Sequence, residues 1–343
     1  MQKLRTFLMR VKSMSFERMK MYARKAAADS GRGYWGIMLD MVICALRYGV
    51  GYLDYYSFGF AHLSAEKRST YMTMNDNLRI ARTLNVQSQR EYFEDKALFA
   101  KSFTDMFRRE FIDLRTSNAQ DLASLIQRSG GVAFAKATGG YGGFGVRRIT
   151  AADAQDPEAL FAELLSKEMY LVEQAITQHP KMNELCPTSV NTIRMVTLEK
   201  DGKATLMYSL VRMGGGSSYV DNISSGGMYC PVDENGVLNA PAFCDKTGEY
   251  YAQHPATHTR FVGFELPYFE QAKQMVLSAA MRIEGVRYIG WDVAIAPDGP
   301  LLVEGNTLPG YDMCQNYRHL GKEKVGIRPK FIGVLGDEFY KNA

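Results

Sequence analysis

The residue pattern of the chain changes near position 131, and this change constrains the fold more than any other feature. Before it, apolar residues recur at helical spacing, which predicts a helix over residues 1–28 and further helices over 34–110. After it, short apolar runs predict strands over 132–136, 146–149, 169–174, 191–198, 204–212, 228–232, 288–296 and 301–304. Helices followed by a hairpin-rich sheet with flanking helices indicate the α+β class.

Tight-turn dipeptides connect several of these strands. Asp201-Gly202, Asn235-Gly236 and Asp298-Gly299 each favour a two-residue turn, so we expect hairpins with antiparallel pairing at these positions. Helix-start signals occur at Asn118, an expected N-cap, and at Asp156-Pro157-Glu158. Later helices are expected over 267–283 and 331–340.

Composition excludes several classes of protein. With 46% hydrophobic and 23% charged residues, the chain is neither disordered nor fibrous. A membrane span needs about 20 largely apolar residues. The longest stretch without Asp, Glu, Lys or Arg has only eleven residues, for example Tyr55–Ala65. The five cysteines are odd in number and include no CxxC pair, which argues against a disulfide framework or a structural zinc site. We therefore expect reduced thiols and a cytoplasmic location.

Positive charge is concentrated in an N-terminal arm. Residues 1–33 carry a net charge of +7, and the other residues carry −3. In residues 1–28, Leu4, Phe7, Leu8, Val11 and Met14 share one helix face. Such a basic helix either packs on its own domain or lies on the inner face of an anionic membrane; a transit peptide is a further alternative. Nucleic acid is not an expected partner, because the charge is confined to the arm and no binding motif occurs.

A glycine-rich loop lies between two predicted strands. Its glycines are Gly139, Gly140, Gly142, Gly143 and Gly145. A Rossmann loop would open a helix and a Walker loop would end in Gly-Lys-Ser/Thr, and neither context occurs here. Backbone N–H groups of such a hairpin can fold over a polyphosphate, and the Lys136 ammonium three residues earlier can balance its charge. The alternative is a mobile hairpin beside a surface lysine.

The hairpin over 290–306 carries a set of hard oxygen ligands. The turn at 298–299 brings Asp292 near Glu304, and Glu304 and Asn306 share one face because alternate strand residues do. Two carboxylates and an amide oxygen suit Mg²⁺ that is shared with nucleotide phosphates. Apolar neighbours such as Trp291 and Val303 favour this interpretation over exposed surface acids.

The lysine, the glycine hairpin and the Asp…Glu-x-Asn set together resemble the ATP-grasp superfamily. The finer resemblance is to the sugar-transfer-associated ATP-grasp family, which is related to α-L-glutamate ligases, and it covers roughly residues 35–320. It rests on the order and spacing of Phe93-Glu94-Asp95-Lys96, Phe134-Ala135-Lys136, Leu171-Val172-Glu173-Gln174-Ala175-Ile176, Ser189-Val190-Asn191-Thr192-Ile193-Arg194, Asp221-Asn222…Gly226-Gly227, His254-Pro255-Ala256-Thr257, Gly290-Trp291-Asp292 and Glu304-Gly305-Asn306-Thr307-Leu308-Pro309-Gly310.

The resemblance implies an ATP-grasp fold, in which two α+β lobes clasp ATP behind a helical N-terminal region. It divides the chain into a basic helix (1–33), a helical region (34–110), a lobe with the glycine lid and adenine hinge (111–180) and a C-terminal lobe with the metal and substrate site (181–343).

The resemblance also implies roles for particular residues. Lys96 and Lys136 would contact nucleotide phosphates, and Glu173, Gln174 and Ile176 would form the hinge that reads adenine. Asp292, Glu304 and Asn306 would hold one or two Mg²⁺. Arg194 and Arg212 would face the transferred phosphoryl group or a substrate carboxylate, since guanidinium forks suit either anion; the alternative is that both are surface arginines.

The chain departs from D-alanine–D-alanine ligases at the ribose. The position of their ribose-binding acid is Pro180 here, which leaves His179, Asn183 and Glu184 as candidates. An acceptor pocket is expected near Asn222, His254, Thr257 and His258, although a lone histidine is more often structural.

The expected activity is that of an ATP- and Mg-dependent carboxylate–amine ligase, which forms an amide through an acyl phosphate. By analogy with the family name, it would join an amino acid to a sugar or other small acceptor in cell-surface polysaccharide biosynthesis. The alternatives are an ATP-grasp kinase that stops at phosphoryl transfer and a membrane-peripheral ATP-binding module without turnover. The sequence leaves the two substrates, the number of metals and the oligomeric state open.

Overall fold

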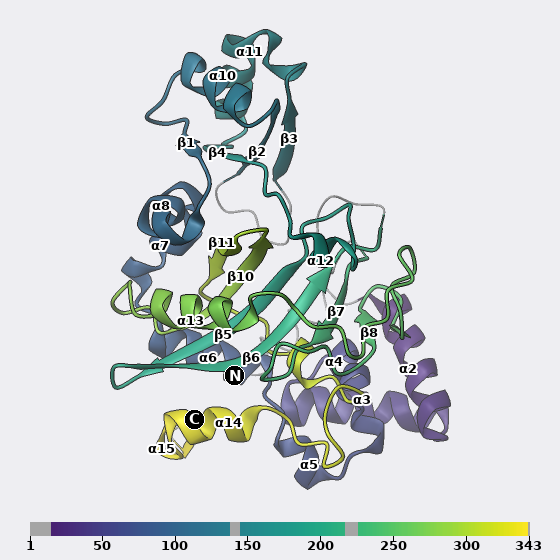
Figure 1. Cartoon of the computed structure of the whole chain (residues 1–343). Helices are drawn as coiled ribbons and strands as arrows, with labels where there is room; N and C mark the ends of the chain where they lie inside the picture. The colour runs from purple at the N-terminus through teal and green to yellow at the C-terminus, as the bar shows by residue number, and fades with distance from the viewer. Residues whose placement is uncertain (1–14, 138–144, 217–225, 342–343) are drawn as a thin grey trace. The chain divides into compact units, whose positions relative to one another are not determined.

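The computed structural model describes residues 15–137, 145–216 and 226–341 (Figure 1). Its contacts divide the chain into two compact units. Unit 1 contains residues 1–83, 247–250 and 308–343, and unit 2 contains residues 84–246 and 251–307. The expected division was contiguous along the chain and ended in one lobe over 181–343; the structure instead groups 308–343 with the N-terminal helices.

Unit 1 is helical, as expected for the region that precedes the sheet. Its helices are α2 (Phe16–Ser30), α3 (Tyr34–Tyr48), α4 (Tyr52–Ser57), η1 (Phe60–His62), α5 (Ala65–Ser69), α6 (Met74–Leu84, whose last residue belongs to unit 2), η5 (Met313–Gln315), α14 (Arg328–Leu335) and α15 (Glu338–Lys341). Helix α2 covers the described part of the helix expected over 1–28. Ser15 caps α2, because its side chain accepts a hydrogen bond from the Arg18 backbone. Residues 1–14 lie outside the described residues.

The helix expected over 331–340 is corrected by the structure. It consists of two helices, α14 and α15, because Gly336 adopts a φ of 85° between them and ends the first one. Polar side chains then hold the C-terminal segment on the helices of unit 1. The buried Gln315 accepts from Met72 N at 2.7 Å and donates to Met72 O at 3.0 Å, and Asn77 donates to Pro309 O at 2.8 Å.

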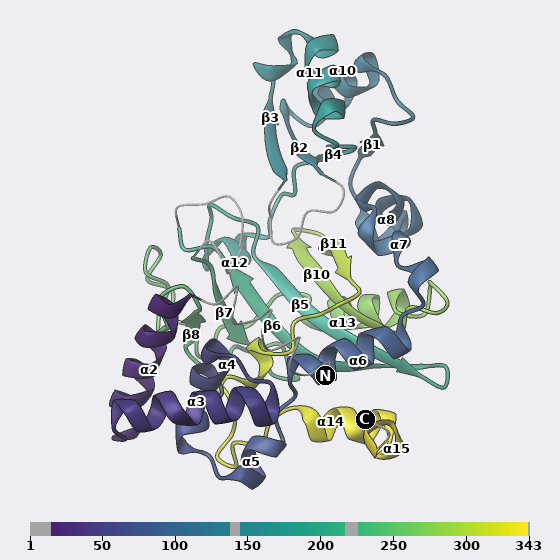
Figure 2. The ribbon, with the colours of Figure 1, turned by 180° about the vertical axis from the view of Figure 1, so that it is seen from behind.

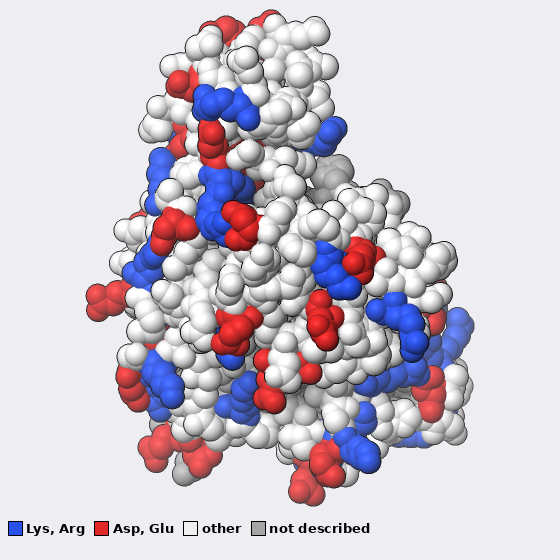
Figure 3. All heavy atoms as spheres, viewed as in Figure 1, with Lys and Arg blue, Asp and Glu red and all other residues white. Residues whose placement is uncertain are grey.

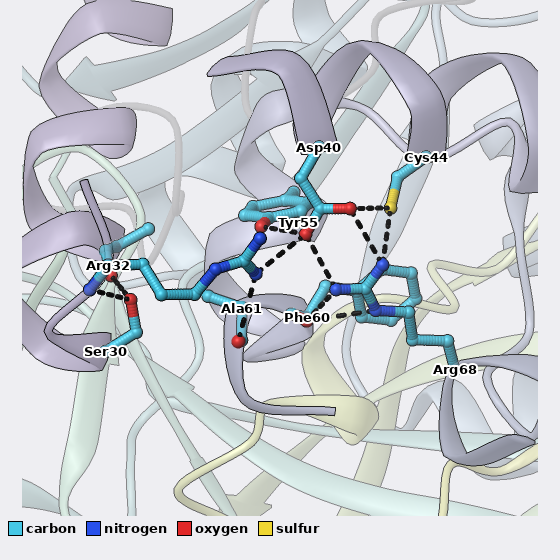
Figure 4. A network of polar contacts seen from close by, with 9 residues as sticks. Ser30, Arg32, Asp40, Cys44, Tyr55, Phe60, Ala61 and Arg68 are labelled. Carbon is cyan, nitrogen blue, oxygen red and sulfur yellow. Dashed lines mark hydrogen bonds and ion pairs between the residues drawn. The ribbon is translucent and has the colours of Figure 1, made fainter. Parts of the chain in front are cut away.

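A charge network joins the helices of unit 1 (Figure 4). Arg68 on α5 donates to both carboxylate oxygens of Asp40 on α3, at 2.9 and 2.7 Å. Arg32 and the Tyr55 hydroxyl also donate to Asp40, at 2.9 and 2.7 Å. Burial alone would raise the pKa of Asp40, but Arg68, Tyr55 and Arg32 outweigh it and lower that pKa to about 2.

Unit 2 contains two antiparallel sheets. The smaller one has the strand order β1-β4-β2-β3 and packs against α10 and α11 around a core that includes Leu122, Leu125 and Leu160. The larger one has the order β11-β10-β5-β6-β7-β8-β9. Of β9, only Tyr251 belongs to unit 2. The strands are β1 (Phe111–Asp113), β2 (Val132–Lys136), β3 (Val146–Thr150), β4 (Leu171–Gln174), β5 (Thr192–Lys200), β6 (Lys203–Met213), β7 (Met228–Pro231), β8 (Ala242–Cys244), β9 (Glu249–Tyr251), β10 (Tyr288–Ala296) and β11 (Gly299–Asn306).

The helices of unit 2 lie before and between these strands. They are η2 (Gln87–Gln89), α7 (Glu91–Glu94), α8 (Lys96–Ser102), α9 (Thr104–Phe107), α10 (Ala119–Arg128), η3 (Asp153–Gln155), α11 (Pro157–Ser166), α12 (Pro180–Asn183) and α13 (Phe269–Ala279). The N-caps expected at Asn118 and Asp156 are confirmed, since each side chain accepts a backbone hydrogen bond from the first turn of its helix. The α+β class is also confirmed.

Two of the three expected hairpins are confirmed. Asp201 and Gly202 adopt φ values of 53° and 77° between β5 and β6, and Gly299 begins β11 after its turn from β10. The third, around Asn235-Gly236, forms with less regular pairing. An isolated antiparallel bridge between Val232 and Leu238 closes the turn, and β7 pairs antiparallel with β8 further along the chain. Strand β1 was not expected, because three residues are too few to show a periodic pattern.

The surface and the cysteines fit the expectations from composition. Over most of the face drawn in Figure 3, basic side chains alternate with acidic ones, and exposed pairs such as Arg128–Glu110 at 2.8 Å account for part of this mixture. All five cysteines are free thiols. Among the helices that the structure describes, none is both long and apolar enough to cross a bilayer.

We expect Asp40→Asn to destabilise the protein in a pH-dependent way. Because the pKa of Asp40 falls from 3.8 to about 2 on folding, its ionised form contributes roughly 2 kcal/mol above about pH 4, and this contribution is lost as the pH falls toward 2. Urea unfolding near neutral pH and near about pH 3 measures the effect. The variant should be less stable at neutral pH, and the difference should shrink in acid; a difference that does not change with pH would show that the charge of Asp40 is not responsible.

Candidate functional site

The first part of the site is a buried charge cluster in the smaller sheet of unit 2. Strands β2 and β4 pair antiparallel with Phe134 opposite Glu173, so Lys136, two residues further on, points to the same face. Lys136 Nζ lies 2.7 Å from a Glu173 oxygen, and Arg109 donates to the other oxygen at 3.0 Å. Burial would raise the pKa of Glu173, but Arg109 and Lys136 outweigh it, so the pKa is lowered and the carboxylate stays ionised.

Lys96 joins this cluster from the start of α8. Asp95 caps the helix by accepting from the Ala97 and Leu98 backbone at 2.9 Å, which places Lys96 in the first turn. Its Nζ donates to Ala137 O at 2.7 Å, one residue beyond β2. Burial lowers the pKa of Lys96, which also interacts with the charges of Glu304 and Lys136. The two lysines expected at nucleotide phosphates are therefore close together.

The second part of the site lies on the larger sheet. Asp292 is the central residue because it pairs with Arg194 on β5 and with Glu304 on β11 at the same register position. Its carboxylate is buried and accepts from Arg194 at 2.5 and 3.0 Å and from Arg212 at 2.9 Å. Burial would raise the pKa of Asp292, and the two guanidinium groups outweigh it and lower that pKa.

Glu304 and Asn306 complete the set expected for a metal. Asn306 Nδ2 lies 3.4 Å from a Glu304 oxygen, as expected for alternate residues on one face of β11. Burial raises the pKa of Glu304, and the Asp292 charge raises it further, while Lys136 opposes the shift. Two neighbouring carboxylates with an amide oxygen beside them are a donor set that fits Mg²⁺. Over the described ranges, no cluster of three or more His, Cys, Asp or Glu side chains is suited to a metal, so the amide is needed as the third donor.

The structure therefore brings the two parts of the predicted site together. Lys136 on the smaller sheet and Glu304 on the larger one are near enough for their charges to interact. Arg194 and Arg212 were expected to face a phosphoryl group or a substrate. In this structure both bind a carboxylate of the protein itself, and neither is a simple surface arginine.

The hinge residues lie where β4 ends. Gln174 donates its backbone N–H to Glu110 O at 2.9 Å. Ile176, two residues beyond the strand, packs on an apolar cluster of the β10–β11 hairpin that consists of Ala294, Ala296, Leu301 and Val303; Val190, which precedes β5, also packs on it. Val303 directly precedes Glu304, so this apolar cluster adjoins the acidic residues.

The side chains expected to bind ribose or the acceptor mainly form hydrogen bonds with backbone groups of the protein itself. His179 caps α12, where its Nδ1 accepts from Lys181 N at 3.0 Å, and its ring meets Tyr268 edge-on. Asn183 and Glu184 bind Gln178 and Lys181. His254 is buried with Nε2 2.9 Å from Gly214 O, and its Nδ1 accepts from the Ala256 and Thr257 backbone.

The remaining candidates differ in how much the structure describes. Thr257 donates its hydroxyl to Leu185 O at 3.1 Å, and His258 is exposed in a left-handed conformation. Gly145 has a φ of 80°, and a Cβ at this position would lie 2.8 Å from the Ala137 side chain. Glycine is therefore required where the loop rejoins β3. The other loop glycines, Gly139, Gly140, Gly142 and Gly143, and also Asn222 lie outside the described residues.

Sequence reasoning missed Arg109. This buried side chain donates to Leu302 O on β11 at 2.7 Å and to Glu173 on β4, so it links the two sheets. Its only signal was its position between a short helix and β1, which any surface arginine could share.

The model of the sugar-transfer associated ATP-grasp family matches residues 75–321, more than half of the chain. No curated protein matches the chain. The family expected from the sequence, and with it the ATP-grasp fold, are therefore confirmed.

The solved structures are distant. N5-carboxyaminoimidazole synthase from Aspergillus clavatus is 13% identical with a TM-score of 0.41, and the match covers 71% of this chain and 52% of that one. D-alanine–D-alanine ligase from Bacillus anthracis is 13% identical with a TM-score of 0.43, and the match covers 78% and 77%. This chain thus spans about half the length of the first of these proteins. At this distance neither likeness carries an argument about function.

We expect Glu173→Gln to destabilise unit 2 by about 3 kcal/mol, because it leaves the buried Arg109 and Lys136 cations without their anion. Glu270→Gln is a matched control, since Glu270 pairs with Lys273 at 3.1 Å with 62% of its side chain exposed. It should change stability by less than about 0.5 kcal/mol. Urea unfolding of both variants checks this; equal losses would contradict the importance of the buried cluster.

Proposed function

Because the chain belongs to the sugar-transfer associated ATP-grasp family, we propose that it is an ATP-dependent ligase that joins a carboxylate to an amine. A substrate carboxylate oxygen attacks the γ-phosphorus of ATP, which gives an acyl phosphate and ADP. The amine nitrogen then attacks the acyl carbon, phosphate leaves, and an amide remains. The family description favours an amino acid joined to a sugar or another small acceptor of a cell-surface polysaccharide.

The observation that carries the proposal is the charge balance of the site. Five cationic side chains surround three buried or half-buried carboxylates, which leaves an excess of positive charge beside an apolar cluster. The cations are Lys96, Lys136, Arg109, Arg194 and Arg212, and the carboxylates are Glu173, Asp292 and Glu304. Such an excess at low dielectric attracts a polyanion, and a triphosphate is the polyanion that an ATP-grasp protein binds.

The apolar cluster suits the other end of the nucleotide. Ile176 lies two residues beyond the end of β4 and packs in the same apolar cluster as Val190 and Val303. A planar base can therefore contact apolar side chains while its edge meets the backbone. We assign Lys96 and Lys136, whose charges interact with that of Glu304, to the phosphates. The ribose partner is proposed among His179, Asn183 and Glu184, each of which also holds a protein group in this structure.

Asp292, Glu304 and Asn306 are the residues that would hold Mg²⁺. A bound Mg²⁺ would neutralise phosphate charge. The role of Arg194 and Arg212 follows from their contacts: they fix both oxygens of Asp292 and keep it ionised, as a metal ligand must be. In addition, their positive charge stabilises negative charge that develops on the phosphoryl oxygens. Chemistry of this kind needs positioning and charge neutralisation rather than a protein nucleophile.

The substrates and the reaction can be tested together. We expect a screen of amino acids and amino sugars to find a pair for which ADP release requires both a carboxylate and an amine. With an ¹⁸O-labelled carboxylate, the released phosphate should carry one ¹⁸O, because the acyl phosphate transfers that oxygen. A stable phosphorylated product formed without any amine would instead establish the kinase alternative. Nucleotide binding without turnover for every pair would favour a binding module.

Variants of the acidic hairpin test the assigned residues. Loss of a residue that only supports a metal ligand costs up to about a hundredfold in activity. Asp292→Asn and Glu304→Gln change the ligands themselves, so each should lower kcat/KM by more than this. Asp298→Asn is the matched control, because Asp298 lies in the turn of the same hairpin with 74% of its side chain exposed. It should retain activity. Full activity of both ligand variants, with folding confirmed by circular dichroism, would remove these residues from the site.

A further inference from the structure

Helix α3 of unit 1 carries apolar side chains on two opposite faces. One face buries Ile37, Met41 and Cys44 at spacings of four and three residues. The opposite face is exposed to solvent, with fractional exposures of 79% for Trp35, 62% for Leu39, 45% for Val42, 47% for Ile43 and 62% for Leu46. A helix that is apolar all round is normally covered on all sides. An exposed apolar stripe of this size therefore indicates a contact surface.

The charge network of unit 1 fixes which face is exposed (Figure 4). Asp40 lies on the inner side of α3 and binds Arg68, Arg32 and Tyr55. Turning the stripe inward would break these ion pairs and leave Arg68 without its carboxylate. Helices α2, α3 and α4 lie side by side in both views (Figures 1 and 2), so the inner face is also held by its neighbours. The outward position of the stripe is thus built into the fold.

Basic side chains flank the stripe at both ends. Lys20 and Arg24 of α2 line a shallow hollow together with Tyr34 and Trp35. Arg47 is exposed in the last turn of α3, four residues after Ile43. The acidic residue of α3, Asp40, is already bound by two arginines. Apolar side chains with a tryptophan at one end and cations on the rim match a lipid surface that carries negative headgroups.

We propose that the exposed face of α3 docks unit 1 onto an anionic membrane surface. With 15 residues, α3 is about 22 Å long, too short to span the hydrocarbon core, so it lies in the plane of the interface. A second copy of the chain fits less well, because a stable pairwise interface uses about 20–30 residues a side. This contact surface is centred on α3 rather than on the arm over 1–28 expected from the sequence, whose described part contributes the rim residues Lys20 and Arg24. It does not depend on the ligase activity.

The two tryptophans of the chain give a direct readout of this docking. Trp35 is on the exposed face, and Trp291 is completely buried in unit 2. On addition of vesicles of phosphatidylcholine and phosphatidylglycerol, Trp35 emission should shift to shorter wavelength, and acrylamide should quench it less. Pure phosphatidylcholine vesicles should bind much more weakly, and added salt should release the protein. Trp35→Phe should abolish the shift, because the remaining tryptophan is already shielded.

Variants separate the apolar and the charged contributions. Leu39→Gln with Ile43→Gln should lower vesicle partitioning by about tenfold or more. The matched control is Val262→Gln with Met281→Gln, which alters side chains of similar exposure, 53% and 47%, in unit 2 and should not change partitioning. Arg24→Gln with Arg47→Gln should lower binding to the anionic vesicles by about tenfold, since each charge contributes a few-fold.

The outcomes decide between the partners. Vesicle binding that is lost in Leu39→Gln/Ile43→Gln and retained in the control supports the proposal. Absence of binding by the wild-type chain, or equal binding by this variant, overturns it. A wild-type dimer that the same variant dissociates, measured by sedimentation velocity without lipid, would overturn it too and assign the face to a second copy.

Discussion

The ion pairs of Asp292 with Arg194 and Arg212 are the interaction on which the candidate site depends. They hold one buried carboxylate on β10, next to the edge strand β11 of the larger sheet and opposite Glu304, and keep it ionised in spite of burial. The strand register makes this possible, because β10 pairs with β5 on one side and β11 on the other. A slip of one residue in either pairing would turn these side chains to the other face of the sheet and leave charges without partners.

The local part of this arrangement could be predicted from the sequence. The turn at Asp298-Gly299 brings Asp292 near Glu304, and the alternation of side chains along a strand puts Glu304 and Asn306 on one face. The register shift between Asp292 and Val293, which sets Asp292 directly opposite Glu304, has no signal in the sequence. The same reasoning predicted the reversal at Asn235-Gly236 but not its irregular pairing, in which a single Val232–Leu238 bridge closes the turn and β7 pairs with β8 further along. It also could not predict that the arginines bind Asp292, because this depends on pairing between β5 and β10, which are far apart in the sequence.

Long-range polar contacts explain the rest of what sequence reasoning missed. Arg109 links β4 to β11, and Gln315 holds the C-terminal segment on Met72. Asp40 on α3 binds side chains from α4, α5 and the loop that contains Arg32. None of these residues belongs to a periodic pattern, and each is recognised only by its burial and its partners. Such contacts decide how segments from distant parts of the chain form units 1 and 2, and in unit 1 they also determine that the apolar stripe of α3 faces outward.

We infer that lysine and carboxylate side chains from the two sheets of unit 2 hold one magnesium nucleotide. The most direct measurement is calorimetric titration of a non-hydrolysable ATP analogue with and without Mg²⁺, for the wild-type chain and for Lys136→Met. We expect binding that needs Mg²⁺ and that weakens at least about tenfold in the variant, which loses a charge-assisted contact to phosphate. Binding of equal strength without Mg²⁺, or unchanged binding by Lys136→Met, would show that these side chains do not hold such a nucleotide.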